Sequence, residues 1–183
     1  MRRLIVTAAA GCTLLAGCSG GNAANTVNTG PFGNGGTPGT ECVRLSPGNV
    51  LSYGFEEFSN NGTSQAVINK VALADAHGLR VLAAYVVPIT GHILYGVLQG
   101  YPPARHLDAG VQWAERQKAN GARIPPSHGH DVNNLVLVLQ PTVKLGSARG
   151  IEVFYSEAGQ QYDLRTATRV VISVSAPCPS QGG

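Results

Sequence analysis

The sequence has few charged residues and no cluster of positive ones. Of its 183 residues, 13 are Lys or Arg and 10 are Asp or Glu, which gives a formal net charge of +3. No run of Lys and Arg is present of the kind that neutralises a phosphate backbone. The sequence therefore gives no support for a nucleic-acid partner.

Sequence motifs for catalysis are also missing. There is no Gly-x-Ser-x-Gly and no Ser-x-x-Lys sequence, the patterns that present an activated serine. Glu56 and Glu57 are neighbours in an expected strand, so their side chains point to opposite faces and cannot form a glycosidase pair. No glycine-rich loop opens a helix as a phosphate site requires. We expect no catalytic residue, no enzymatic activity and no cofactor.

The N-terminus carries an apolar run that is too short to span a membrane. Met1-Arg2-Arg3 precedes an uncharged stretch from Leu4 to Gly17, whereas a transmembrane helix needs roughly 20 apolar residues. A basic head followed by a short apolar run is typical of a secretory signal peptide. We therefore assign residues 1–17 to a signal peptide.

This run ends in Leu15-Ala16-Gly17-Cys18, followed by Ser-Gly-Gly. The pattern resembles the lipobox of bacterial lipoproteins, and the resemblance covers about the first 20 residues. It implies cleavage before Cys18 and lipidation of the Cys18 thiol, and two or more acyl chains hold a protein firmly on a membrane. We expect an extracytoplasmic protein anchored to the cell membrane. The alternatives are a secretion signal cut elsewhere or a buried helix.

Residues 18–40 contain no charged side chain and consist mostly of Gly, Asn, Thr, Ser and Pro. Such a composition buries too little apolar surface to offset the entropy of ordering. We expect a lipidated, disordered tether with a reach of about 25 Å. A peptide recognised by a partner is the alternative. The folded domain is assigned to residues 41–179, and we expect residues 180–183 to form a disordered tail.

Two cysteines, Cys42 and Cys178, lie at the ends of this domain. Because the resemblance places the domain outside the cytoplasm, removes Cys12 and lipidates Cys18, we expect a Cys42–Cys178 disulfide. The alternative is two unpaired thiols. If Cys42 precedes the first strand and Cys178 follows the last, those two strands run antiparallel.

Alternating apolar residues indicate a series of β-strands. One set comprises Val67, Asn69, Val71 and Leu73, and a second comprises Leu79, Val81, Ala83, Tyr85 and Val87. The segment NLVLVLQP is apolar on both faces and indicates a central strand. Turn residues such as Asn60-Asn61-Gly62 separate the strands. The pattern predicts an all-β fold, an antiparallel, immunoglobulin-like β-sandwich of about seven to eight strands.

The segment from Gly100 to Asn133 interrupts this pattern. It predicts a long loop with a short helix, capped by Asp108 and ended by Asn120-Gly121. Trp113, the only tryptophan, lies in this segment with Tyr101 and Arg116. Because Trp and Arg are enriched at binding hot spots, we interpret these three residues as a candidate binding surface. The alternative is that Trp113 only covers the edge of the core.

His128-Gly129-His130-Asp131 is a weak metal-site candidate, because two imidazoles and a carboxylate could share an ion. The other histidines have no diagnostic spacing, and a polar loop is the alternative. A blue-copper site is excluded because Met1 is the only methionine and no free thiolate remains. We expect a non-catalytic binding or structural module of the cell envelope, with a protein or cell-wall partner. A metal- or small-ligand-binding lipoprotein using His128 and His130 is the second hypothesis.

Overall fold

A computed structural model of the protein describes residues 27–34, 38–103, 107–127 and 132–178. Nearly all of its regular structure is β-strand. The strands are β1 (Val27–Asn28), β2 (Phe32–Asn34), β3 (Gly39–Leu45), β4 (Leu51–Asn60), β5 (Ala66–Ala74), β6 (Leu79–Ile89), β7 (Gly96–Gln99), β8 (Gln117–Lys118), β9 (Arg123–Ile124), β10 (Val132–Pro141), β11 (Leu145–Ala148), β12 (Gly150–Glu157), β13 (Gln160–Arg165) and β14 (Thr168–Val174). A single 3-10 turn, η1 (Trp113–Glu115), is the helical element of the described residues.

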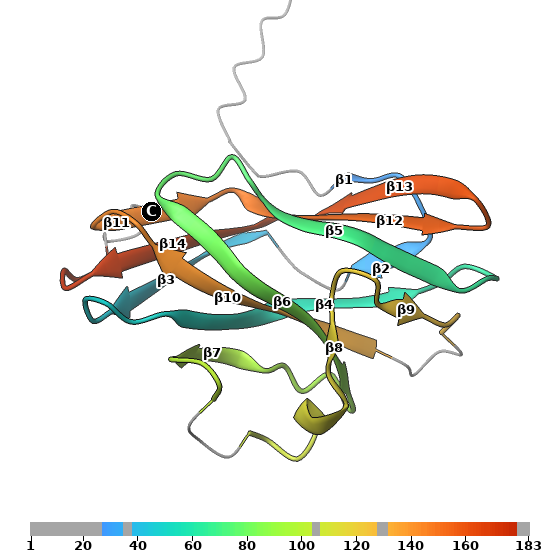
Figure 1. Ribbon diagram of the computed structural model, residues 1–183, viewed down its shortest axis with the longest axis horizontal. Coiled ribbons are helices and arrows are strands. Elements are labelled where there is room, and N and C mark those ends of the chain that lie inside the picture. Colours follow the sequence, from blue (N-terminus) through green and yellow to red (C-terminus); the bar gives the residue numbers. More distant parts are fainter. Residues whose placement is uncertain (1–26, 35–37, 104–106, 128–131, 179–183) are drawn as a thin grey trace, which may run out of the picture.

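The strands form a sandwich (Figure 1). One sheet has the order β1-β13-β12-β5-β9, and a second has the order β2-β4-β10-β6-β8, with β7 also paired to β4. A third sheet, β11-β14-β3, completes the sandwich. The prediction of an immunoglobulin-like β-sandwich is confirmed, and short edge strands supplement the longer ones.

All three sheets contribute to one main core. Leu135, Leu137 and Leu139 of β10 are at most 1% exposed and belong to this core, whereas Val136 packs in a second cluster on the opposite face of the same sheet. β10 pairs with β4 on one side and β6 on the other. The apolar NLVLVLQP segment is therefore the central strand that its sequence predicts.

Bulges in β5 and β6 change which residues face the core. Asn69 of β5 is the extra residue opposite β12, so Ile68 faces the core before the bulge and Val71 faces it after. Leu82 of β6 is the extra residue opposite β10, so Val81 and Ala84 both contact the main core. The predicted alternation is wrong across these two positions, because a bulge shifts the side-chain phase by one residue.

The N-terminal residues that the structure describes belong to the sandwich. β1 pairs with β13, and β2 pairs with β4. Phe32 is fully buried, its ring stacks on Tyr155 with centroids 3.8 Å apart, and its N–H donates to the Tyr155 hydroxyl at 3.0 Å. The expectation of a disordered tether is therefore wrong for residues 27–34, because one aromatic side chain supplies the apolar burial that the rest of the segment lacks.

The expected disulfide joins Cys42 and Cys178, whose Cα atoms are 5.9 Å apart. The expected antiparallel arrangement is wrong, because β3 and β14 pair in parallel, with Cys42 opposite Val171. Cys42 lies inside β3 rather than before it. After β14 the chain reverses at Ser175, which has φ of +66° and donates its N–H to Leu45 O at 3.0 Å. This reversal returns Cys178 to Cys42.

The segment expected as a long loop closes one side of the sandwich. β8 pairs with β6 of the six-stranded sheet, and β9 pairs with β5 of the five-stranded sheet. Ala119 and Ala122 between them are buried in the main core. The expected helix is reduced to η1, whose N-cap residue is Gln112 rather than Asp108. Asp108 instead accepts the Gly110 N–H at 3.0 Å in an Asx turn.

Candidate functional site

A second hydrophobic cluster lies on the outer face of the six-stranded sheet. Its buried members are Val87, Ile89, Tyr95, Val111 and Val136, with Tyr85, Leu94, Leu98, Leu107, Trp113 and Val132 packed against them. The segment that carries β7 and η1 lies over this face (Figure 1). The cluster therefore holds the segment that carries β7 and η1, called the excursion below, against a sheet face that would otherwise be apolar and exposed.

Three aromatic rings and one guanidinium meet at the edge of this cluster, and we call Tyr85, Tyr101, Trp113 and Arg116 the aromatic–arginine surface. The ring of Tyr85 stacks with Tyr101 at 5.6 Å and meets Trp113 at 5.8 Å, and Tyr101 lies 6.3 Å from Trp113. The Tyr101 hydroxyl donates to the Tyr85 hydroxyl at 2.6 Å. Residues from β6, the turn after β7 and η1 thus form one cluster.

Arg116 is fixed on these rings. Its guanidinium carbon lies 4.7 Å from the Trp113 ring centroid and 5.8 Å from that of Tyr85, within the range of cation–π contact. Its Nη1 donates to Trp113 O at 3.0 Å. The Arg116 side chain is exposed. The remaining donors of the guanidinium are therefore held toward solvent, where they can bind a carboxylate or a carbonyl.

Buried polar contacts fix the support beneath this surface. Tyr95 packs on Trp113 with ring centroids 5.2 Å apart. Its N–H donates to Asn134 Oδ1 at 2.8 Å, and Asn134 Nδ2 donates to the Glu56 carbonyl at 2.7 Å. Asn134 is fully buried in the central strand. The Asn134 side chain therefore connects the excursion, which carries Trp113, to the central strands of the sheet.

The structure brings together all three residues that the sequence singles out, Tyr101, Trp113 and Arg116. Sequence reasoning assigns no part in this surface to Tyr85, because Tyr85 occupies one apolar position in an alternating strand. The Leu82 bulge separates Tyr85 from the core-facing Val81 and Ala84 and places it on the outer face. Trp113 is half-buried against the second cluster, so it covers apolar surface and is also partly accessible to solvent.

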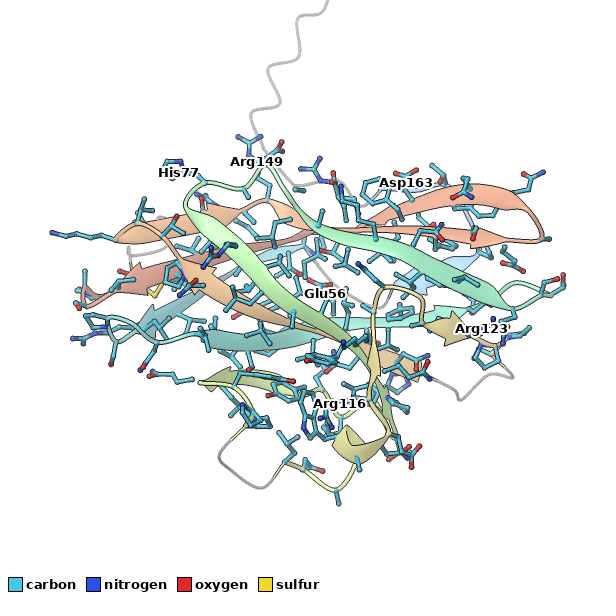
Figure 2. All side chains as sticks on the ribbon, in the orientation of Figure 1. Glu56, His77, Arg116, Arg123, Arg149 and Asp163 are labelled. Carbon is cyan, nitrogen blue, oxygen red and sulfur yellow. A yellow bond between two sulfur atoms is a disulfide. The ribbon has the colours of Figure 1, made fainter. Side chains whose placement is uncertain are left out.

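A second candidate group is the buried carboxyl of Glu56 in β4 (Figure 2). A bulge between β4 and β10 places Glu56 opposite Leu135 and Tyr53 opposite Leu137, so both side chains face the core. Tyr53 and Glu56 are three positions apart, so regular alternation places their side chains on opposite faces of the strand. This is why reasoning from the sequence misses the pair. Among the described residues, the Glu56 carboxyl oxygens and the Tyr53 hydroxyl have no partner at full hydrogen-bond geometry.

Burial raises the pKa of Glu56 above its usual value, and the nearby hydroxyls of Thr168 and Thr166 lower it by less than burial raises it. Burial also raises the pKa of Tyr53, with the charge of Glu56 as a second cause. The Glu56 side chain faces the main core and is 2% exposed. It is a buried ionisable group that makes stability depend on pH.

Glu57, the neighbour of Glu56, points to the other face, as the sequence predicts. Its Oε2 lies 3.1 Å from Nδ1 of His92, and the His92 side chain is exposed. His128, His130 and Asp131, the candidate metal ligands, lie outside the described residues, as does Cys18. In the part of the chain that the structure describes, no group of three or more His, Cys, Asp or Glu side chains could hold a metal ion. No helix in that part is long and apolar enough to cross a membrane.

Comparison with known proteins assigns no function. No protein-family model matches the chain, and no curated protein matches its sequence. Among solved structures, the chain is similar to an ASH / PapD-like domain of human CEP192, its PapD-like domain 7. The sequence identity is 12% and the TM-score is 0.40, over 81% of this chain and 87% of that domain.

Proposed function

We propose that the protein is a membrane-anchored lipoprotein of the bacterial cell envelope and a non-catalytic binding module. The aromatic–arginine surface is its recognition surface, and a protein or cell-wall component of the envelope is its partner. Lipid on Cys18 anchors the chain, and residues 19–26 link the anchor to the first strand. The sandwich then displays the surface outside the membrane.

The observation that carries the binding role is the position of Arg116 on Trp113 and Tyr85. Aromatic rings supply a rigid contact area that loses little conformational entropy on binding, and a stacked guanidinium adds directional donors. Trp, Tyr and Arg are the residue types most enriched at binding hot spots. Because Arg116 is held in place before a partner arrives, binding loses less side-chain entropy.

Two observations support the location. The sequence Leu15-Ala16-Gly17-Cys18 has the form of a lipobox. The Cys42–Cys178 disulfide is of the kind that persists in oxidising compartments and is rare in the cytoplasm. Together they favour a protein that is exported, lipidated and then oxidised.

Intact-mass measurement on protein extracted from its native membrane tests the anchor. We expect a mass that corresponds to residues 18–183 plus lipid, and a gain of the hydrogens of one disulfide on reduction. A polypeptide that starts at Cys18 without lipid, or that starts elsewhere, would show that the protein is secreted free. Such a result would contradict the anchor and leave the binding surface to be tested separately.

A further inference from the structure

β5 and β6 are consecutive strands that enter different sheets and diverge after the turn at residues 75–78 (Figure 1). Both strands bulge, at Asn69 and at Leu82. The segment between β8 and β9 bridges them at one end only. There the Ala119 N–H donates to Ala84 O, and the Gly121 N–H donates to Ile68 O, both at 2.8 Å. Beyond this bridge, the gap between the two strands holds a pocket lined by side chains of both.

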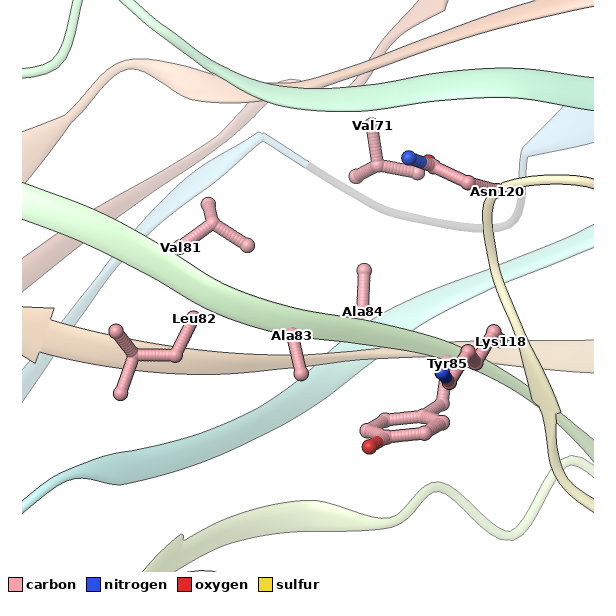
Figure 3. A pocket seen from close by; sticks show the side chains of 8 residues that line it. All are labelled: Val71, Val81, Leu82, Ala83, Ala84, Tyr85, Lys118 and Asn120. Carbon is pink, nitrogen blue, oxygen red and sulfur yellow. The ribbon is translucent and has the colours of Figure 1, made fainter.

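A groove of about 380 Å³ occupies this gap (Figure 3). Val71 of β5 faces Val81 and Ala84 of β6 across it, and Leu82 lies on the outer side. Lys118 and Asn120 close one end. The volume falls in the range of ligand sites. Side chains from both faces of β6 line the groove, so the edge of the strand itself is accessible within it.

The chain itself shows that this edge accepts a strand. β8 pairs antiparallel with Tyr85 and Val86, and then leaves β6 at Ala119 to cross to the other sheet. In the described residues no strand pairs with Leu79–Ala83 on the side away from β10. The backbone groups of that stretch therefore lie where β8 would pair if it continued. A sheet edge with this geometry is a template for an added strand.

We propose that the β6 edge groove binds an extended acidic peptide, which adds a strand beside Leu79–Ala83. Apolar side chains of the peptide enter between Val71 and Val81, and an acidic side chain meets Lys118. Lys118 is the one side chain charged at neutral pH among those that line the groove, and no carboxylate is among them. Arg80, the charged residue of β6 in this stretch, does not line the groove and donates instead to Gln140 of β10. This site is separate from the recognition surface proposed above, and shares only Tyr85 with it.

The test uses the intact protein and a synthetic, end-blocked peptide of alternating valine and glutamate, about six residues long, the usual length of a strand. A peptide of alternating valine and lysine is the control ligand. Binding is measured by titration, and amide hydrogen exchange locates it. We expect the acidic peptide to bind and to slow exchange within residues 79–83, and the basic peptide to bind at least about tenfold more weakly.

Charge reversal identifies the contact. Lys118→Glu should weaken the acidic peptide at least about fivefold and improve the basic one, because it inverts the charge at the end of the groove. Lys144→Glu makes the same change at an exposed site on another sheet connection and should alter neither affinity. Leu82→Ala, with Leu145→Ala as its matched exposed control, should also weaken binding.

Three results would overturn the proposal. The first is no binding of the acidic peptide, which would mean that the bulge and the lysine protect the edge from pairing. The second is that Lys118→Glu and Lys144→Glu change the affinity equally. The third is that the peptide slows amide exchange at Tyr101 and Trp113 in place of residues 79–83. The last result would assign peptide binding to the aromatic–arginine surface, so failure here and failure of the proposed function are distinguishable.

Discussion

The guanidinium of Arg116 and the indole of Trp113 form one unit, because the cation lies 4.7 Å from the ring centroid and also donates to the Trp113 carbonyl at 3.0 Å. Trp113 is the only tryptophan of the protein, so indole fluorescence reports on this pair alone. Trp113 packs against the second hydrophobic cluster, whereas Arg116 is exposed. Trp113 should therefore contribute more than Arg116 to the stability of the fold.

Replacement of Arg116 should change the surface without unfolding the protein. Arg116→Ala should shift the fluorescence of Trp113 and lower the free energy of unfolding by no more than about 1 kcal/mol. Trp113→Phe, which removes the indole but keeps an aromatic ring, should lower it by about 1–2 kcal/mol. Urea titration followed by far-UV circular dichroism measures both. An Arg116→Ala variant with unchanged fluorescence would show that the stacked pair does not form in solution.

The buried carboxyl of Glu56 should make the protein less stable as the pH rises. Burial raises the pKa of Glu56 in the folded state above its unfolded value of about 4.3. Between these two values the folded state binds more protons than the unfolded state, so the free energy of unfolding falls with rising pH. Stability from this group is fully present below the unfolded pKa and lost as the pH rises through the folded one.

Glu56→Gln removes this titration. We expect the variant to be more stable than the parent at pH 7 by about 1–2 kcal/mol and to show a flatter dependence of stability on pH. Glu57→Gln removes the carboxyl of the adjacent and partly exposed residue and is the comparison variant. If the two variants had the same pH dependence, Glu56 would not be the ionisable group that sets it.

Phe32 should contribute to the stability of the whole domain, although it lies in a segment with the composition of a linker. It is fully buried and stacks on Tyr155, so Phe32→Ala should lower the free energy of unfolding by about 3–5 kcal/mol. Thr29→Ala, in the same segment as Phe32, removes only the exposed hydrogen bonds that the Thr29 hydroxyl makes with the Oδ1, the carbonyl and the N–H of Asp163. It should cost no more than about 1 kcal/mol. Thermal unfolding of the two variants measures the difference. Equal stabilities would place residues 27–34 outside the folded domain.

Reduction of the disulfide should destabilise the fold without changing it. The bond between Cys42 and Cys178 spans a sequence separation of 136 residues. In the chain-entropy model a loop of this size gives a stabilisation of up to about 5 kcal/mol. The Cys42→Ser, Cys178→Ser double variant should therefore unfold at lower urea concentration and gain nothing from oxidising conditions. A variant as stable as the parent would show that the bond does not constrain the unfolded chain.

Alternation of apolar residues is sufficient to predict the fold class and the central strand at Leu135–Leu139, and the break in that alternation marks the excursion that carries Tyr101, Trp113 and Arg116. It fails where the backbone departs from regular pairing. Bulges at Asn69 and Leu82 reverse the side-chain phase, and no local sequence signal marks either position. The bulge in β4 likewise turns Glu56 inward, against the usual exposure of a carboxylate.

Two further differences come from long-range contacts. The burial of Phe32 depends on Tyr155, which is far away in the sequence, so composition alone assigns residues 27–34 to the tether. The parallel pairing of β3 with β14 is compatible with the disulfide because the chain reverses at Ser175 and returns Cys178 to Cys42. A disulfide constrains which residues meet, but it leaves the direction of the strands on either side of it open.

The most direct test of the recognition surface is photo-crosslinking in living cells. A photoreactive amino acid replaces Ala114, the exposed middle residue of η1 between Trp113 and Glu115, and the control carries it at the exposed Lys144. Our account predicts a discrete adduct from position 114 that is lost when Arg116→Ala is added, and none from position 144. An adduct that forms equally well without Arg116, or no adduct at position 114, would contradict it.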